Sequence, residues 1–358
     1  MEIIGPRLIV PANSSRLFES YSEALNQEPG IIQLGYQDSD PLIFNCEHKP
    51  NLIKYDSQYC TAISTYKSKY EFETLKYFGA LMKYLPTNPS IIEIGCGKGE
   101  FILELEKIGI NAKGFDPVAP PSTCNLFNRY WHPTDLPGDL YVMRCVLPHI
   151  QDPWEFLSKI SQSSPSALVL IEFQQIEWVI DNCVWYQINH DHVNLFSIHD
   201  FERRYNVVES GTHSNGEWGW ALIQPSTFTP PPQIILSEFI RERLGVLFQK
   251  RQKAISLVRS INRPLAIFGG AAKGSILAHA FSLETENIFV VDADSNRWDR
   301  YLELTKCKVV SPEKAIKFMP PETLVLVANP NHLNEIKNFI GTHYNIVTAN
   351  TFNDTNML

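Results

Sequence analysis

The pattern of hydrophobic and polar residues changes near residue 86. Before it, clusters of Pro, Asn and Ser interrupt short apolar runs, until a helix-like spacing appears at Tyr70, Phe72, Leu75, Phe78, Leu81 and Met82. From residue 90 onward, short apolar runs alternate with amphipathic segments, as in "IIEIG", "GEFILELEKIG", "AKGFDP", "DLYVMRCVL", "DPWEFLSKI" and "ALVLIEF". This alternation predicts a parallel sheet with helices on both faces.

A second unit of the same kind follows a break at "PSTFTPPPQ". An apolar stripe beginning at Ile234 predicts a long connector helix, after which strand and helix patterns resume. We therefore expect an α/β protein with a doubly wound, Rossmann-like domain and a second, smaller Rossmann-like domain. The predicted regions are a short irregular substrate-side or lid region (1–85), the first α/β domain (86–229), the connector (230–263) and the second α/β domain (264–358).

Charge and cysteine content narrow the class of protein. The 358 residues contain 31 basic and 39 acidic residues, a net charge of −8, without a Lys/Arg-rich run, so nucleic acid is not expected as a partner. The seven cysteines are never in C-x-x-C spacing, which favours a reducing compartment. Neither a targeting pattern nor a membrane-length apolar run is visible, and we expect a cytoplasmic protein that does not enter a membrane.

The stretch "IIEIGCGKGEF" places Gly95, Gly97 and Gly99 between a predicted strand and a predicted helix. Such a loop directs backbone N–H groups and a helix N-terminus toward a polar or anionic ligand. A dinucleotide fingerprint would need glycine at position 100, where Glu100 stands. An acid at the end of the second strand, Asp116, is placed to bind both hydroxyls of a ribose. A turn that merely joins strand and helix is the alternative.

Together, these residues resemble the first two motifs of class I S-adenosylmethionine-dependent methyltransferases. The resemblance implies S-adenosylmethionine as cofactor, held by Glu93, Gly95, Cys96, Gly97, Gly99, Asp116 and Pro117. The later segment "GDLYVMRCVLPHIQDPWEFLSKI" is similar to the fourth-strand region of these enzymes, which borders the site of methyl transfer and here contains His149.

A histidine-rich segment, "WYQINHDHVNLFSIHDF", contains His190, Asp191, His192, His199 and Asp200. As a metal site it lacks a third ligand at a recognised spacing. As a catalytic site, Asp191 would raise the pKa of His192 and make it a better general base. A purely structural loop is the third interpretation.

This segment is similar to the Tyr-His-Glu-His segment of S-adenosylmethionine-dependent sugar C-methyltransferases, which act on nucleotide-linked keto-deoxysugars. The resemblance implies that His192 is the base, that Asp191 and His149 assist it, and that Asn189 stands in the place of the family tyrosine. Implied substrate-side residues are His190 and a tyrosine, Tyr59 or Tyr66; each tyrosine is as well explained by core packing.

Two features outside this segment bear on the resemblance. The family's paired N-terminal zinc cysteines are missing. The corresponding segment contains only Cys46, His48 and Cys60 as potential zinc ligands, so no metal is expected. The C-terminal unit resembles the family's Rossmann-like domain, which helps to hold the nucleotide-sugar.

The C-terminal loop also allows other ligands. Gly269 and Gly274 have dinucleotide spacing, with Asp292 further on, so a nicotinamide cofactor is the alternative there. Lys273 would neutralise a substrate phosphate or remain a solvated surface lysine.

The sequence thus predicts a methyltransferase of carbohydrate biosynthesis that acts on a small molecule, a nucleotide-linked keto-sugar. The alternatives are an O-methyltransferase of a sugar or other small metabolite, and a binding or scaffold protein that has lost turnover. Oligomeric state is not determined by the sequence.

Overall fold

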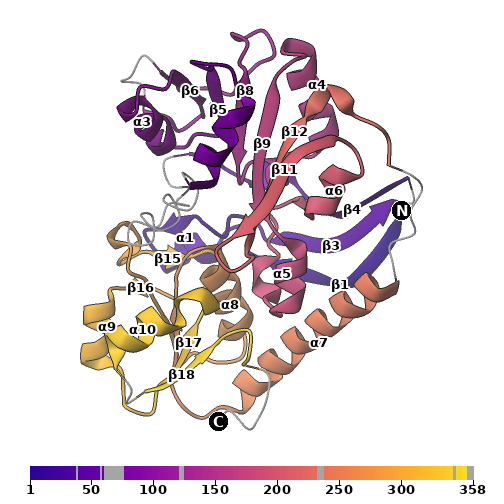
Figure 1. Cartoon of the computed structure of the whole chain (residues 1–358). Helices are drawn as coiled ribbons and strands as arrows, with labels where there is room; N and C mark the ends of the chain where they lie inside the picture. The colour runs from indigo at the N-terminus through magenta and orange to yellow at the C-terminus, as the bar shows by residue number, and fades with distance from the viewer. Residues whose placement is uncertain are drawn as a thin grey trace.

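The computed structural model describes residues 1–37, 39–56, 59, 76–120, 125–231, 238–341 and 344–352. These residues form two large sheets flanked by helices and a smaller antiparallel sheet between them (Figure 1). The predicted α/β class is confirmed, because both large sheets consist mainly of parallel strands.

The first large sheet has seven strands in the order β11-β12-β9-β8-β5-β6-β7. Five of them run parallel, whereas β12 is antiparallel to both of its neighbours. Every residue of β5 and the first four residues of β8 are buried, because helices cover both faces. The strands are β5 (Ile91–Ile94), β6 (Ala112–Phe115), β7 (Leu126–Phe127), β8 (Leu140–Arg144), β9 (Leu168–Gln174), β11 (Asn206–His213) and β12 (Trp218–Gln224), and the helices are α3 (Glu100–Lys107), α4 (Pro153–Ser163), α5 (Ile176–Asp181) and α6 (Ile198–Glu202).

The second large sheet is parallel throughout, in the order β16-β14-β13-β17-β18. The connector expected before it is α7 (Glu238–Ser260), a helix of 23 residues. The strands are β13 (Leu265–Phe268), β14 (Ile288–Val291), β16 (Val309–Val310), β17 (Leu324–Val327) and β18 (Asn345–Thr348), and the helices are α8 (Ala272–Ser282), α9 (Pro312–Phe318) and α10 (Leu333–Ile340).

The N-terminal region differs from the irregular segment that we expected. It contains α1 (Tyr21–Leu25) and three antiparallel strands, β1 (Glu2–Val10), β3 (Gly30–Gln37) and β4 (Asp40–Asn45). A fourth strand, β10 (Asn194–Leu195), comes from the histidine-rich segment. The sequence pattern did not reveal this sheet, because its register shifts between Ile4 and Leu8 and its last strand is remote in sequence.

The N-terminal region is also joined to the C-terminal unit. Strand β2 (Leu17–Phe18) pairs with β15 (Tyr301–Leu302), and α7 packs along β1 (Figure 1). The buried carboxylate of Glu303 accepts hydrogen bonds from the backbone N–H groups of Ala12 at 3.1 Å and Asn13 at 2.7 Å. One apolar cluster therefore joins the N-terminal strands, α5, α7 and the second large sheet, and it includes Tyr36, Trp185, Leu247 and Phe281.

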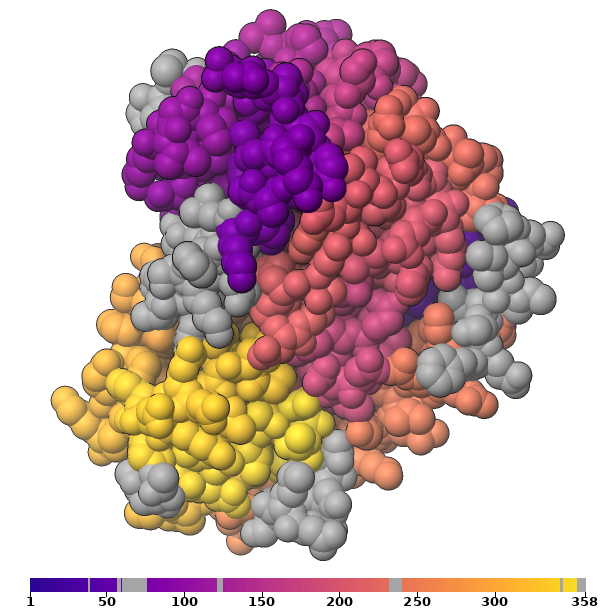
Figure 2. Space-filling view, in the orientation of Figure 1, coloured from indigo at the N-terminus to yellow at the C-terminus, as the bar shows by residue number. Residues whose placement is uncertain are grey.

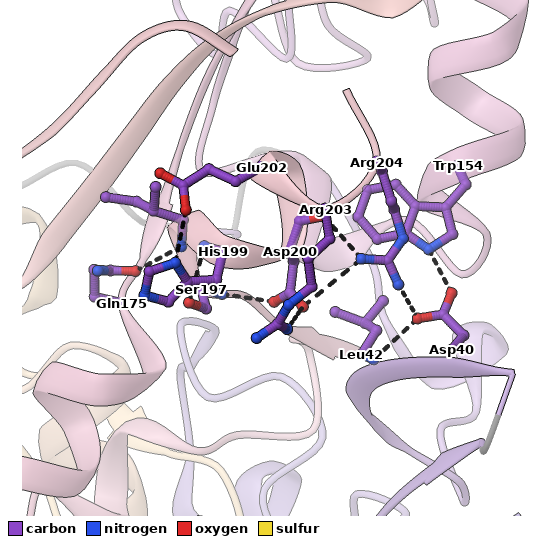
Figure 3. A network of polar contacts seen from close by, with 11 residues as sticks. Asp40, Leu42, Trp154, Gln175, Ser197, His199, Asp200, Glu202, Arg203 and Arg204 are labelled. Carbon is purple, nitrogen blue, oxygen red and sulfur yellow. Dashed lines mark hydrogen bonds and ion pairs between the residues drawn. The ribbon is translucent and has the colours of Figure 1, made fainter. Parts of the chain in front are cut away.

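A buried charge fixes the N-terminal sheet to the first large sheet. Arg204, at the end of α6, is fully buried and forms an ion pair with Asp40 of β4 (Figure 3). Trp154 donates from Nε1 to the same carboxylate at 2.8 Å, and its ring lies 4.3 Å below the Arg204 guanidinium. Because an unpaired charge would be costly here, this cluster specifies how β4 and α6 meet.

We predict that Gly274→Ala lowers the free energy of unfolding by about 2 kcal/mol. A methyl group there would lie 1.6 Å from the backbone oxygen of Gly269, so α8 would have to move away from the β13 loop. The control is Gly245→Ala in α7, where no atom lies within 4 Å and alanine favours the helix by about 1 kcal/mol. Urea denaturation measures both; equal effects would contradict the close contact.

Candidate active site

The glycine loop after β5 has a backbone that only glycine adopts readily. Gly95, Gly97 and Gly99 have φ values of +74°, +56° and +84°. A Cβ atom on Gly95 would lie 2.2 Å from Val146 Cγ2, and one on Gly99 would lie 2.5 Å from Leu126. Beside Gly97, in contrast, no atom of the described residues lies within 4 Å of a Cβ position. A ligand can therefore approach the loop at Gly97.

Asp116 closes this loop from the end of β6. Its carboxylate accepts the N–H groups of Gly97 at 3.0 Å and Val118 at 2.8 Å, across the intervening Pro117. Burial raises the pKa of Asp116 above its usual value. Each carboxylate oxygen still has a second lone pair, so the group can accept hydrogen bonds from ribose hydroxyls.

Two predicted cofactor residues support the loop from inside. Glu93 is fully buried and accepts a 2.9 Å hydrogen bond from Nε of Arg144, and its Oε2 has no partner. Burial raises the pKa of Glu93. The side chain of Cys96 packs on β6, since a Cβ atom on Gly114 would lie 2.6 Å from its sulfur. Both side chains therefore hold the loop in place.

The histidine-rich segment lies next to this loop. His149 belongs to the 3-10 helix η3 (Leu147–His149), which follows β8 and begins after Val146, the residue in contact with Gly95. Its Nδ1 lies 3.1 Å from Oδ1 and 3.0 Å from the backbone oxygen of Asp191. The ring of His192 meets that of His149 edge-on, with centroids 4.7 Å apart. The structure thus brings together His149, Asp191 and His192.

Two tyrosines complete the surroundings of Asp191. Tyr55 donates to Oδ1 at 2.8 Å and Tyr59 donates to Oδ2, so Asp191 is 3% exposed and fully hydrogen-bonded. Sequence reasoning named Tyr59 as a substrate contact and missed Tyr55, four residues earlier in "YDSQY". Tyr66 lies outside the described residues. Tyr59 is therefore placed as a partner of Asp191.

The protonation states differ from those we expected. Burial alone would raise the pKa of Asp191 and lower that of His149, but their mutual attraction outweighs burial, so the pKa of Asp191 falls and that of His149 rises. Burial, followed by the positive charge of His149, lowers the pKa of His192 to about 3. Asp191 raises the pKa of His192 as we expected, but burial and the charge of His149 outweigh this effect, so the net shift is downward. The centre therefore places a histidine with a raised pKa, His149, beside one with a lowered pKa, His192.

Two other predicted site residues hold the backbone. The Oδ1 atom of Asn189 accepts the N–H of His192 at 3.0 Å, and Nδ2 donates to the backbone oxygen of Gln187 at 3.2 Å. His190 is fully buried between two backbone partners, the oxygen of Ile31 at 2.8 Å from Nδ1 and the N–H of Lys49 at 3.2 Å from Nε2. We expected Asn189 in the place of the catalytic tyrosine and His190 as a substrate contact; these hydrogen bonds tie both side chains to the backbone.

The remaining residues of the histidine-rich segment lie apart from this centre. Asp200 forms a capping box with Ser197 at the start of α6 and His199 pairs with Glu202 at 2.6 Å (Figure 3). Among the described ranges, no group of three or more His, Cys, Asp or Glu side chains is arranged to hold a metal.

Lys273 is paired with an internal carboxylate. Its Nζ donates to Glu217, a buried residue at the tip of the β11–β12 hairpin, which also accepts from Asn331 Nδ2 at 2.9 Å and Asn329 Nδ2 at 3.3 Å. Figure 2 shows this red hairpin against the yellow C-terminal unit. Burial alone would raise the pKa of Glu217, but Lys273 outweighs it and the pKa is lowered. The ammonium group is therefore already neutralised where we expected a substrate phosphate.

The C-terminal glycine loop is built like the first. Asp292 accepts the N–H groups of Gly270 at 2.5 Å and Asp294 at 2.8 Å, as Asp116 accepts those of Gly97 and Val118. Its crevice differs, because Glu217 places a carboxylate beside the start of α8, where a phosphate would bind.

Comparison with known protein families supports a methyltransferase domain in the region that contains the first glycine loop. Residues 66–206 match the model of a family described as "Methyltransferase domain". No curated protein matches the sequence. Solved structures with a similar fold include the PH0226 protein from Pyrococcus horikoshii OT3, at 15% identity and a TM-score of 0.34, covering 48% of this chain and 94% of that chain.

Two further solved structures are similar. One is the mycolic acid cyclopropane synthase CmaA1, complexed with SAH and CTAB, at 13% identity and a TM-score of 0.33, covering 44% of this chain and 70% of that chain. The other is CalO1, a methyltransferase in calicheamicin biosynthesis, in its SAH-bound form, at 13% identity and a TM-score of 0.32, covering 45% of this chain and 58% of that chain.

The matched region is a class I S-adenosylmethionine-dependent methyltransferase domain, and it contains the glycine loop, Asp116, His149 and His192. S-adenosylmethionine is therefore the cofactor of this protein. The described residues fit it, since the space beside Gly97 is open and Asp116 retains acceptor capacity. No helix in the described ranges is long and apolar enough to cross a membrane.

We predict that Asp116→Asn weakens binding of S-adenosylhomocysteine about tenfold, because an amide loses the charge and half of the acceptors that face the ribose. Titration calorimetry on the whole chain measures this. The control is Asp292→Asn, the equivalent position of the C-terminal loop, which should leave the affinity within about twofold. NAD should bind to neither loop, and NAD binding that survives Asp116→Asn would instead support the dinucleotide interpretation.

The Asp191–His149 pair predicts a pH dependence of stability. A raised pKa in the folded state means that protonation of His149 contributes stability that is complete below its unfolded pKa of about 6.5. That contribution disappears as the pH rises through the raised pKa. Asp191→Asn should flatten the stability change above pH 6.5, and NMR titration should show a lower pKa of His149. An unchanged titration would contradict the pairing.

Proposed function

We propose that this methyltransferase transfers a methyl group to the carbon next to the carbonyl of a nucleotide-linked keto-sugar. The observation that carries the proposal is the edge-on contact of His192 with His149 next to the glycine loop; the pKa of His149 is raised and that of His192 is lowered. Two titratable groups whose environments push their pKa values apart are suited to act as a base and as a stabiliser of negative charge.

In the proposed reaction, His192 acts as the base. Its neutral ring accepts the proton from the acceptor carbon, and the electron pair of that C–H bond moves into the carbonyl as an enolate. S-adenosylmethionine supplies an electrophilic methyl group on a positively charged sulfur. A C–C bond forms as the C–S bond breaks, and His192 then returns its proton to solvent.

His149 stabilises the enolate through its charge. Its ring is held by the side chain and backbone of Asp191, and the backbone of Cys145 also raises its pKa. These bonds fix its position in a buried site, where a preorganised charge is most effective. The two tyrosines keep Asp191 from taking the proton, because both of its oxygens already accept hydrogen bonds.

The keto-sugar assignment is supported by the resemblance of the segment around His192 to sugar C-methyltransferases and by the second Rossmann-like unit. Lys273 does not add support, since its charge is paired with Glu217. The nucleotide of the substrate would therefore be recognised by other residues.

O-methylation of a sugar or another small metabolite is the second candidate. It is favoured by the contacts of Asn189, because its Oδ1 accepts from His192 and one of its two amide N–H groups already donates to Gln187, which limits it as a substitute for a tyrosine hydroxyl. Removal of a proton from a hydroxyl by His192 needs no such donor. The methylated atom of the product distinguishes the two reactions.

We predict that His192→Ala lowers kcat by about 10²–10⁴-fold, because general-base catalysis is lost. The assay supplies methyl-labelled S-adenosylmethionine and a panel of nucleotide-linked keto-deoxysugars and simple sugars, and NMR of the product identifies the methylated atom. The affinity for S-adenosylhomocysteine should stay within about twofold.

His199→Ala is the matched control, since this exposed histidine pairs only with Glu202 among the contacts described and lies outside the centre. It should retain full turnover. Binding of S-adenosylhomocysteine without turnover of any acceptor would favour a scaffold protein over an enzyme.

A further inference from the structure

We propose that His48 is an additional acceptor-binding residue of this centre, hydrogen-bonded to hydroxyl groups of the sugar; the inference rests on the proposed function. His48 belongs to the N-terminal region, where it follows β4, and its backbone N–H donates to the oxygen of Asn45 at 3.3 Å. The sequence had offered it only as an isolated zinc ligand.

The His48 ring packs against the ring of His190, which is itself held in place by hydrogen bonds. Its centroid lies 5.1 Å from that of His190, with the two planes inclined by 30°. His190 is held between the backbones of Ile31 and Lys49. Pairing of β4 with β10 brings these rings from distant parts of the chain to one place. His48 thus packs against His190, the residue that precedes Asp191.

Both ring nitrogens of His48 are buried, and neither has a hydrogen-bond partner among the residues that the structure describes. Buried polar atoms are nearly always bonded in folded proteins, and leaving one unbonded is costly. The neighbouring His190 and His149 rings have bonded nitrogens. The unsatisfied ring therefore indicates a partner that arrives with the ligand.

The chemistry of the ring defines that partner. Burial, followed by the nearby His190, lowers the pKa of His48 to about 4. Smaller effects on this pKa come from Asp191, which raises it, and from His149, which lowers it. A neutral imidazole has one N–H donor and one acceptor nitrogen. Two hydroxyl groups, one accepting from the N–H and the other donating to the acceptor nitrogen, satisfy such a ring. Sugars carry hydroxyls next to the reacting carbon, whereas an apolar acceptor would leave both nitrogens unbonded.

A metal does not explain this ring within the described residues. The Cys46 sulfur points to β3, where a Cβ atom on Gly35 would lie 2.5 Å away. Cys60 lies outside the described residues.

The test uses the full-length protein, methyl-labelled S-adenosylmethionine and a nucleotide-linked keto-deoxysugar that the wild type methylates. His48→Phe keeps a planar ring and removes both nitrogens, and should lower kcat/KM for the sugar about 30-fold, mainly through KM, by loss of two hydrogen bonds. His48→Asn restores a donor and an acceptor and should recover most of this loss. His199→Phe is the control and should match the wild type.

Affinity for S-adenosylhomocysteine should be unchanged in all variants, which separates acceptor binding from cofactor binding. An unchanged kcat/KM in folded His48→Phe would overturn the role of His48 and leave the proposed function intact. Failure of the wild type to methylate any acceptor would overturn both.

If His48→Phe does not fold, NMR of the wild type decides. The ring-nitrogen resonances of His48 should shift when the sugar is added to the S-adenosylhomocysteine complex, and unshifted resonances would refute the proposal.

Discussion

Burial of the Asp191 carboxylate is the constraint on which the site depends. A charge in this position must be compensated, and the compensation comes from His149 after β8 and from Tyr55 and Tyr59 of the N-terminal region. These partners join two parts of the chain at a single carboxylate. The carboxylate itself raises the pKa of His149, whereas burial, followed by His149, lowers the pKa of His192. The same contacts therefore organise the fold locally and set the proton chemistry.

The two glycine loops show how similar backbones acquire different roles. Each loop is closed by an aspartate, Asp116 in one and Asp292 in the other. Each aspartate accepts hydrogen bonds from one N–H of its glycine loop and from the N–H of the residue two positions after the aspartate. The first remains open beside Gly97. In the second, the Glu217 carboxylate of the neighbouring hairpin pairs with Lys273. An internal anion thus binds where a phosphate would otherwise be expected, and it attaches the C-terminal unit to the methyltransferase sheet.

The N-terminal region is stabilised without the zinc cysteines of the family that the sequence resembles. Its strands pair with β10, its apolar side chains join the core shared with α7 and α8, and Glu303 and Arg204 bind it through buried polar contacts. Strand pairing and apolar burial stabilise this region, whereas small domains with little hydrophobic core often depend on a bound metal for stability. This packing also brings Tyr55 and His48 to the methyltransferase centre.

The sequence by itself determined the elements that depend on local periodicity: the alternating strands and helices, the connector helix, and the glycine loop with Asp116. It also pointed to His149, Asp191 and His192 as neighbours. Only the tertiary structure decided which of them pair. The bond between Asp191 and His149 spans 42 positions, that between Lys273 and Glu217 spans 56, and the β10–β4 pairing completes a sheet that no local pattern revealed. Periodicity reports which face of an element is buried, whereas the partner of a buried charge is chosen by segments that meet only when the chain has folded.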